Sequence, residues 1–148
     1  MLTDIEIQFN AKQCNGKRPR IKWNFRGYSH EQALIGSSTA GFKLDLAEGP
    51  HIIRFEFINK TNEDTTQDQD LAVIIEDIRI NGISDEKIFN HTVYRPKYPE
   101  PWFSEQSEQP KAELYAHRYL GWNGSWELEF GVPAFEWLHQ TMGFGWHY

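Results

Sequence analysis

The sequence has few of the features that mark secreted, membrane-spanning or disulfide-rich proteins. Cys14 is its one cysteine, so no intrachain disulfide can form. No run of apolar residues approaches the roughly 20 that a membrane-spanning helix needs. The start, Met1-Leu2-Thr3-Asp4-Ile5, lacks the basic and apolar regions of a signal peptide. We therefore expect a protein that is made in the cytosol without a signal peptide and does not insert into a membrane.

A surplus of positive charge is also absent. The 15 Lys and Arg residues are outnumbered by 21 Asp and Glu, which gives a net charge of −6. Proteins that bind nucleic acid or anionic membranes through phosphate groups usually carry the opposite sign. The composition therefore argues against nucleic acid as a partner.

The motifs of common catalytic sites are missing as well. The six histidines show neither His-x-His nor His-Glu-x-x-His spacing, and no serine lies in a Gly-x-Ser-x-Gly elbow. Glu127 and Glu129 have the chemistry of a glycosidase pair. However, they alternate with apolar residues and are expected to be ordinary outward-facing side chains of a strand. We expect no enzymatic activity.

What the sequence does contain is alternation. Aromatic residues make up 15% of the chain, and many occur in runs where apolar and polar residues alternate. This period of two is typical of strands with one buried face. It recurs at residues 3–9, 18–28, 42–46, 53–57, 71–80 and 126–130. Because 148 residues suffice for one domain with its own core, the pattern predicts an all-β sandwich or barrel.

Two segments fall outside this pattern. Residues 95–110, called the arm below, hold four prolines among aromatic residues, and proline interrupts helices and sheet interiors, so an extended arm or a long loop is expected there. Residues 132–148 predict a short helix followed by an aromatic end. The single β-sandwich domain is therefore expected to comprise residues 1–94 and 111–131, with an arm and a C-terminal extension outside it.

Finer features can be predicted for some segments. Between residues 71 and 81 the apolar residues change parity across Glu76-Asp77, which predicts a β-bulge, and Asn81-Gly82 predicts a turn with positive φ. Residues 29–40 have the composition of a loop, with a short strand near Leu34-Ile35 as a further possibility. Short strands are expected at Ile88-Phe89 and Val93-Tyr94, and residues 112–120 fit either a strand or a short helix.

Carboxylates crowd the acidic loop, the segment from residue 61 to residue 70, which has neither basic nor apolar residues. They repel one another unless a cation joins them, and calcium takes six to eight oxygen ligands. The loop is therefore a candidate calcium site, although its spacing is not that of an EF-hand. A solvated loop that is soluble because of its charge is the alternative.

Positive charge is concentrated on one strand. Its outward face is a candidate contact for an acidic partner surface, a phosphate or an acidic glycan, and charge protection of an edge strand is the alternative. The C-terminal residues Phe144 and Trp146 are expected to dock on this domain or on a neighbouring subunit. The basic residues of the strand are Arg18, Arg20, Lys22 and Arg26.

Three motifs occur in a recognisable order. Gly16-Lys17-Arg18-Pro19 precedes a strand ending at Gly27, Gly49-Pro50-His51 opens a strand ending at Asn59, and Asp68-Gln69-Asp70-Leu71 opens a strand ending at Asn81-Gly82. This order resembles that of the calcium-dependent xylan-binding carbohydrate-binding modules, over residues 16–83. The resemblance implies a jelly-roll-like antiparallel β-sandwich, calcium as a cofactor and a polysaccharide as a partner.

The match departs from that family in the residues near calcium. Asn59-Lys60 stands where the family has Asn-Asp, and Gln69-Asp70 where it has Arg-Asn. The resemblance places a calcium-side aspartate at Asp68, and Asp64 and Asp70 are candidates to replace the lost ligands. The aromatic platforms expected to grip sugar rings are Trp102, Tyr98 and Trp122.

The C-terminal third has no counterpart in that family. Its runs L-G-W-N-G-S-W-E-L-E-F and P-A-F-E-W-L resemble segments of tailed-bacteriophage structural proteins. The preferred interpretation is therefore a non-enzymatic, virion-associated structural or adhesion protein, a capsid or tail component that forms a homo-oligomer or contacts other virion proteins. The alternative is a stand-alone calcium-dependent glycan-binding module.

Overall fold

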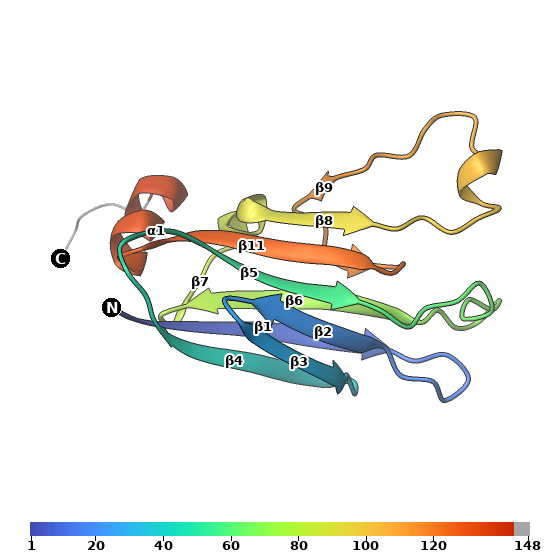
Figure 1. The fold of residues 1–148 in the computed structure, drawn as a ribbon, viewed down its shortest axis with the longest axis horizontal. Helices are drawn as coiled ribbons and strands as arrows, with labels where there is room; N and C mark the ends of the chain where they lie inside the picture. The colour runs from blue at the N-terminus through green and yellow to red at the C-terminus, as the bar shows by residue number, and fades with distance from the viewer. Residues whose placement is uncertain (144–148) are drawn as a thin grey trace.

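The strands stack as two antiparallel sheets in the computed structural model, which describes residues 1–143 (Figure 1). Within these residues the five-stranded sheet has the order β10-β6-β1-β4, with β7 paired to β6. Its strands are β1 (Leu2–Lys12), β4 (Ser37–Asp45), β6 (Ala72–Ile80), β7 (Ile83–Ser84) and β10 (Tyr119–Leu120). The predicted all-β class and two-sheet sandwich are confirmed.

The second sheet has six strands among the described residues, in the order β3-β2-β5-β11-β8-β9. They are β2 (Arg20–Phe25), β3 (Tyr28–Ala33), β5 (Gly49–Phe57), β8 (Thr92–Pro96), β9 (Leu114–Tyr115) and β11 (Gly124–Val132). The helices described are the 3₁₀ turns η1 (Glu86–His91) and η2 (Phe103–Glu105) and the α-helix α1 (Ala134–Met142).

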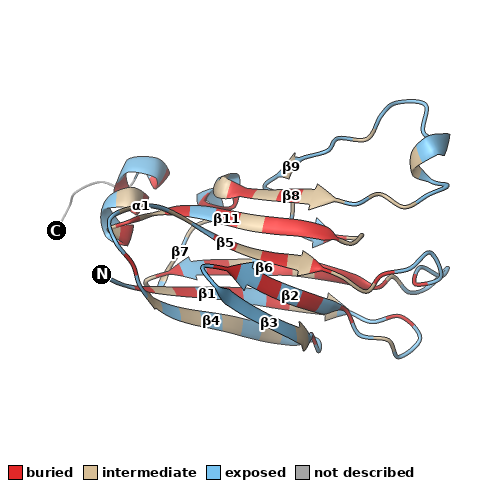
Figure 2. Ribbon diagram, in the orientation of Figure 1, coloured by how far each residue is buried: buried red, intermediate tan, exposed pale blue. Residues whose placement is uncertain are grey.

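Aromatic side chains join the two sheets in the core. Phe9 of β1 contacts Trp23 and Phe55 of the opposite sheet, with ring centroids 6.1 and 5.6 Å apart. Trp126 of β11 stacks on Phe55 at 5.1 Å. Such pairs add roughly 0.5–1.5 kcal/mol each beyond the burial of their area. Figure 2 shows the buried residues between the sheets, where the alternating sequence predicted them.

The predicted bulge and turn are both present. Along the β1–β6 ladder, Gln8 lies opposite Asp77, but Phe9 lies opposite Ile75, so Glu76 is the extra residue. This one residue flips the parity of the side chains that follow it. Asn81 and Gly82 have φ values of 49° and 79°, as the turn between β6 and β7 requires.

Two predictions of local structure are wrong. Residues 29–40 are not a loop, because they contain most of β3 and the start of β4, whereas Leu34-Ile35, where a short strand was possible, lies between these two strands. The side chains of β3 are nearly all exposed, so this edge strand has no alternation from which it could be recognised. Residues Ile88 and Phe89 are buried as expected but belong to the 3₁₀ turn η1 rather than to a strand.

The acidic loop connects the two sheets. β5 and β6, the strands on either side of it, pair with other strands and lie in different sheets, so the loop crosses one end of the sandwich. The arm lies at the same end, whereas α1 and the N-terminus lie at the opposite end (Figure 1). The acidic loop and the arm, which are distant in the sequence, therefore meet at one end of the sandwich.

The C-terminal helix follows its prediction. α1 ends at Gly143, which has a left-handed φ of 73°, and its Leu138 and Met142 are buried. The arm is shorter at its start than expected, because Arg95 and Pro96 still belong to β8. Phe144 and Trp146 lie outside the described residues. No helix among residues 1–143 has the length and apolar character needed to cross a membrane.

Candidate functional site

A cleft of about 350 Å³ opens at the end of the sandwich where the acidic loop and the arm meet. We call it the Trp122 cleft. Four aromatic residues line it, together with polar groups from the acidic loop and its flanks. The aromatic residues are Tyr94, Tyr98, Tyr119 and Trp122, and the polar ones used below are Lys60, Thr65, Asp70 and His117.

Tyr94 holds the backbone of Trp122 in place. The Tyr94 hydroxyl donates to the carbonyl oxygen of Trp122 and accepts from the Trp122 N–H at 3.1 Å. The ring of His117 stacks on Tyr94, with centroids 5.7 Å apart. Burial raises the pKa of the Tyr94 phenol well above its ordinary value, so this hydroxyl stays protonated. Trp122 is thus anchored by a neutral, buried partner on β8.

A buried ion pair forms one wall of the cleft. The Lys60 ammonium lies 2.5 Å from Asp70 Oδ1, and the Lys60 side chain is 1% exposed. The same ammonium lies 4.6 Å from the ring centroid of Trp122, within the range of a cation–π contact. Lys60 therefore connects the acidic loop to the aromatic side of the cleft.

Asp70 has two further donors. Thr65 Oγ1 donates to its Oδ1 at 2.7 Å, and the Tyr119 hydroxyl donates to its Oδ2 at 2.5 Å. Burial opposes ionisation of Asp70, but the bonds from Lys60, Thr65 and Tyr119 outweigh it and lower the pKa of this carboxyl. Burial and the neighbouring Asp70 charge raise the pKa of Tyr119. At neutral pH Asp70 is thus a fixed carboxylate and Tyr119 a neutral donor.

The backbone of Lys60 is clamped as well. Its N–H donates to Asn123 Oδ1 at 2.8 Å, and Asn123 Nδ2 donates to its carbonyl oxygen at 2.9 Å. Asn123 follows Trp122 directly in the turn before β11. The start of the acidic loop and the aromatic platform are therefore held at a fixed separation.

The three predicted metal ligands do not converge. Asp64 Oδ2 accepts from the Lys17 ammonium at 2.7 Å and from the Thr61 backbone at 2.7 Å, whereas Asp68 is exposed in the acidic loop. In the part of the chain that the structure describes, no three His, Cys, Asp or Glu side chains gather closely enough to hold a metal ion. Two of the carboxylates that calcium would need are already paired with lysines, so this arrangement does not fit the ion.

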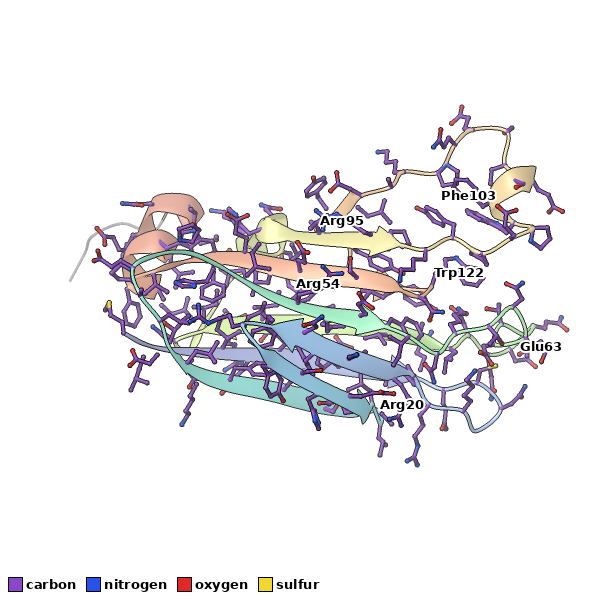
Figure 3. All side chains as sticks on the ribbon, viewed as in Figure 1. Arg20, Arg54, Glu63, Arg95, Phe103 and Trp122 are labelled. Carbon is purple, nitrogen blue, oxygen red and sulfur yellow. The ribbon has the colours of Figure 1, made fainter. Side chains whose placement is uncertain are left out.

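Two of the three predicted aromatic platforms line the cleft. Tyr98 and Trp122 face it, and Tyr98 is fixed through its hydroxyl, which donates to the carbonyl oxygen of Lys111 at 2.7 Å. Trp102 lies outside the cleft, packed against Tyr98 with ring centroids 5.3 Å apart, and is 38% exposed. Figure 3 shows Trp122 beneath the arm residue Phe103, which stacks on Tyr98 at 5.9 Å.

The sequence predicts no role for most of the other residues that line the cleft, among them Tyr94, His117, Tyr119, Lys60 and Thr65. Tyr119 belongs to the segment 112–120, whose two short strands gave no clear pattern. At Lys60 the sequence departs from the carbohydrate-binding family that it resembles, and this departure is the sequence signal for a special role at the position.

One of the four residues of the predicted basic stripe forms an ion pair in the described part of the chain, and a second lies opposite two glutamates. Arg20 Nε lies 3.1 Å from Glu31 Oε1, and Lys22 lies opposite Glu31 and Glu56 in the ladders. The Arg26 guanidinium bonds to His51, while Arg18 is exposed. The alternative interpretation of an edge strand is wrong, because β2 lies between β3 and β5.

Glu127 lies on the outer face of the six-stranded sheet, as predicted. Its carboxylate is 3.6 Å from an Arg54 nitrogen and 3.1 Å from an Arg95 nitrogen. Arg95 also pairs with Glu113 at 2.9 Å, and Figure 3 shows both arginines on this face. The carboxylate is therefore tied into a surface ion-pair network.

No protein-family model matches the chain, and no curated relative was found. Among solved structures, the chain is similar to vCBM60 in complex with galactobiose, with a TM-score of 0.49 and 17% identity over 86% of this chain and 97% of that one.

A selenomethionine form of vCBM60 is similar to the same degree. Its TM-score is 0.49 and its identity 16%, over 87% of this chain and 90% of that one. That structure is described as showing that circular permutation links two families of calcium-dependent carbohydrate binding modules. These values describe a resemblance in overall shape and supply no argument about what this chain binds.

Proposed function

We propose that this chain is a non-catalytic binding protein that holds a carbohydrate in the Trp122 cleft. The observation that carries this proposal is the composition of one fixed cleft. It combines the aromatic side chains of Tyr98 and Trp122 with the charged pair Lys60–Asp70. Sequence composition alone also marks Tyr98 and Trp122 as aromatic platforms and Asp70 as a candidate ligand-binding carboxylate.

The chemistry of a sugar suits this combination. A pyranose ring has an apolar C–H face, which packs on the electron-rich face of an aromatic ring, and a rim of hydroxyl groups. A carboxylate offers about four lone-pair positions. Two lone-pair positions on Asp70 Oδ1 and one on Oδ2 already accept hydrogen bonds. One position on Oδ2 is left for a hydroxyl of the ligand.

The size of the cleft indicates a short segment of glycan. Its volume of about 350 Å³ lies at the lower end of the range of roughly 300–1,000 Å³ for small-molecule sites. The groups that line it are held by hydrogen bonds within the protein, so little order has to be gained on binding. We expect the cleft to accept one or two sugar units of a longer chain.

The experiment is a glycan array followed by calorimetric titration of the best glycan. Trp122→Ala should weaken binding at least about tenfold, because it removes the central aromatic platform. Phe135→Ala is the matched control, because Phe135 is 54% exposed on α1 at the opposite end. If no glycan on the array binds, or if wild type and Trp122→Ala bind with equal affinity, the proposal is contradicted.

A role as a virion-associated structural or adhesion protein stays a prediction, as do the homo-oligomer and the virion location. The feature that favours it is the arm, where Trp102 is 38% exposed beside Tyr98. Light scattering should then show an assembly that Trp102→Ser weakens. A strictly monomeric protein at high concentration would count against this role.

A further inference from the structure

Two lysines hold the acidic loop in place. Lys60 directly precedes the loop and reaches across its mouth to Asp70, 2.5 Å away. Lys17 comes from the connection between β1 and β2 and lies 2.7 Å from Asp64 Oδ2. The backbone closes the loop as well, since the Leu71 N–H donates to the carbonyl oxygen of Asp64 at 2.9 Å.

The ammonium groups do what a divalent cation does in a loop of this composition. An ammonium is a compact charge with three donors, so it can neutralise one carboxylate and still contact other groups. Lys60 does both, because it bonds Asp70 and also lies over the ring of Trp122. One side chain thereby fixes the acidic loop and the aromatic platform together.

The remaining carboxylates need no counter-ion. Asp64 and Asp70 are the two that face the protein, and each has its own lysine. Glu63 and Asp68 are exposed, where water and salt screen their repulsion. The charge that predicted a calcium ion is therefore already compensated within the chain.

We propose that Lys60 and Lys17 take the place of a metal ion in the acidic loop, so that the Trp122 cleft keeps its shape and binds without calcium. The statement about binding rests on the proposed carbohydrate function. The statement about the loop stands on the two ion pairs and is tested separately.

The first test measures the thermal unfolding of wild-type protein in EDTA and in about 10 mM calcium chloride. This concentration is about tenfold above the weakest dissociation constants of extracellular calcium modules. A site filled to that degree would raise the melting temperature by about 3 to 6 °C in a chain of this size. We expect no rise above about 2 °C, and a larger rise overturns the proposal.

The second test removes each lysine. In Lys60→Met and in Lys17→Met, the amides of the acidic loop should exchange hydrogen about tenfold faster or more. Lys43→Met is the matched control, because Lys43 is exposed on β4 away from the loop. If Lys60→Met does not fold, the result for Lys17→Met decides between the outcomes. The Lys17 side chain is 38% exposed, so the protein should still fold without it. Unchanged exchange in the folded variants overturns the proposal.

The third test repeats the titration of the best array glycan in EDTA. We expect the dissociation constant to stay within about a factor of two of its value in calcium. Binding that is lost in EDTA and restored by calcium overturns the metal-independent cleft. A protein that binds no glycan under either condition contradicts the proposed function alone, and the first two tests still decide the role of the lysines.

Discussion

Tyr119 donates its hydroxyl hydrogen to Asp70 Oδ2 across 2.5 Å, and this bond joins β10 to the acidic loop. β10 is the edge strand of the five-stranded sheet, and it is only two residues long. A strand of this length gains little stability from its own ladder. The hydrogen bond therefore fixes both the strand and the carboxylate that faces the Trp122 cleft.

Tyr119→Phe should lower the free energy of unfolding by about 1–2 kcal/mol, because it removes one donor from a charged acceptor and keeps the ring. Urea unfolding at neutral pH measures this. Tyr115→Phe is the matched control, since Tyr115 is 65% exposed on β9 of the six-stranded sheet and should change stability by less than about 0.5 kcal/mol. Equal loss in both variants would show that the bond to Asp70 is not stabilising.

The stability of the protein should depend on pH through Asp70. Although burial opposes its ionisation, its hydrogen bonds lower its pKa in the folded state below the ordinary 3.8. The unfolded chain then binds the proton at a higher pH than the folded protein does. This contribution is fully present above the unfolded value and is lost as pH falls through the folded value.

The variant Asp70→Asn tests the direction of this pH dependence of stability. The variant should be less stable than wild type at about pH 7, and the difference should shrink as the pH falls from about 5 to about 3. Asp68→Asn is the control, because Asp68 is exposed in the acidic loop. Urea unfolding across this range measures both. A difference for Asp70→Asn that stays constant or grows on acidification contradicts the assignment.

The sequence predicts the strands with one covered face well and the exposed edge strand β3 poorly. β1 was recognised because Ile5, Ile7 and Phe9 alternate with polar residues, and all three are fully buried. β3 escaped notice, because an edge strand with exposed side chains on both faces has no period of two. Strand recognition from alternation works only where one face of the strand is covered.

The site was predicted in part for a similar reason. Local composition marks aromatic residues and carboxylates, so Tyr98, Trp122 and Asp70 were identified as candidates. Local composition does not show which charged residues will form ion pairs. Lys17 and Asp64, which do so, are 47 positions apart in the sequence. Calcium was therefore inferred from a loop whose counter-charges come from outside it.

Glu127 provides a test of the view that the chain is not a glycosidase. Its carboxylate pairs with Arg54 and Arg95 on the outer face of the six-stranded sheet, whereas the Trp122 cleft lies at the end of the sandwich. Glu127→Gln should leave glycan affinity unchanged and lower the free energy of unfolding by at most about 1 kcal/mol. A glycan-hydrolysing activity in wild type that this variant abolishes would overturn that view.

Gly131 permits the close contact between α1 and β11. A Cβ built on Gly131 would lie 2.6 Å from Trp137 Cδ1 and 2.9 Å from Trp137 Cγ. The ring of Trp137 also contacts His91, with ring centroids 4.9 Å apart, so a shift of the indole would disturb that contact as well. The absence of a side chain at Gly131 is therefore a packing requirement rather than a backbone one, because its φ lies outside the left-handed region.

Gly131→Ala should therefore lower the free energy of unfolding by about 1–3 kcal/mol, the usual cost of overpacking. Gly41→Ala makes the same change in a strand, β4, where a Cβ would meet nothing within 4 Å and the backbone is also not left-handed. It should be neutral or slightly stabilising, because alanine restricts the unfolded chain more than glycine does. Urea unfolding of the two variants isolates the contact with Trp137 from the general effect of a methyl group. If both variants lose the same stability, α1 does not depend on this contact for its position.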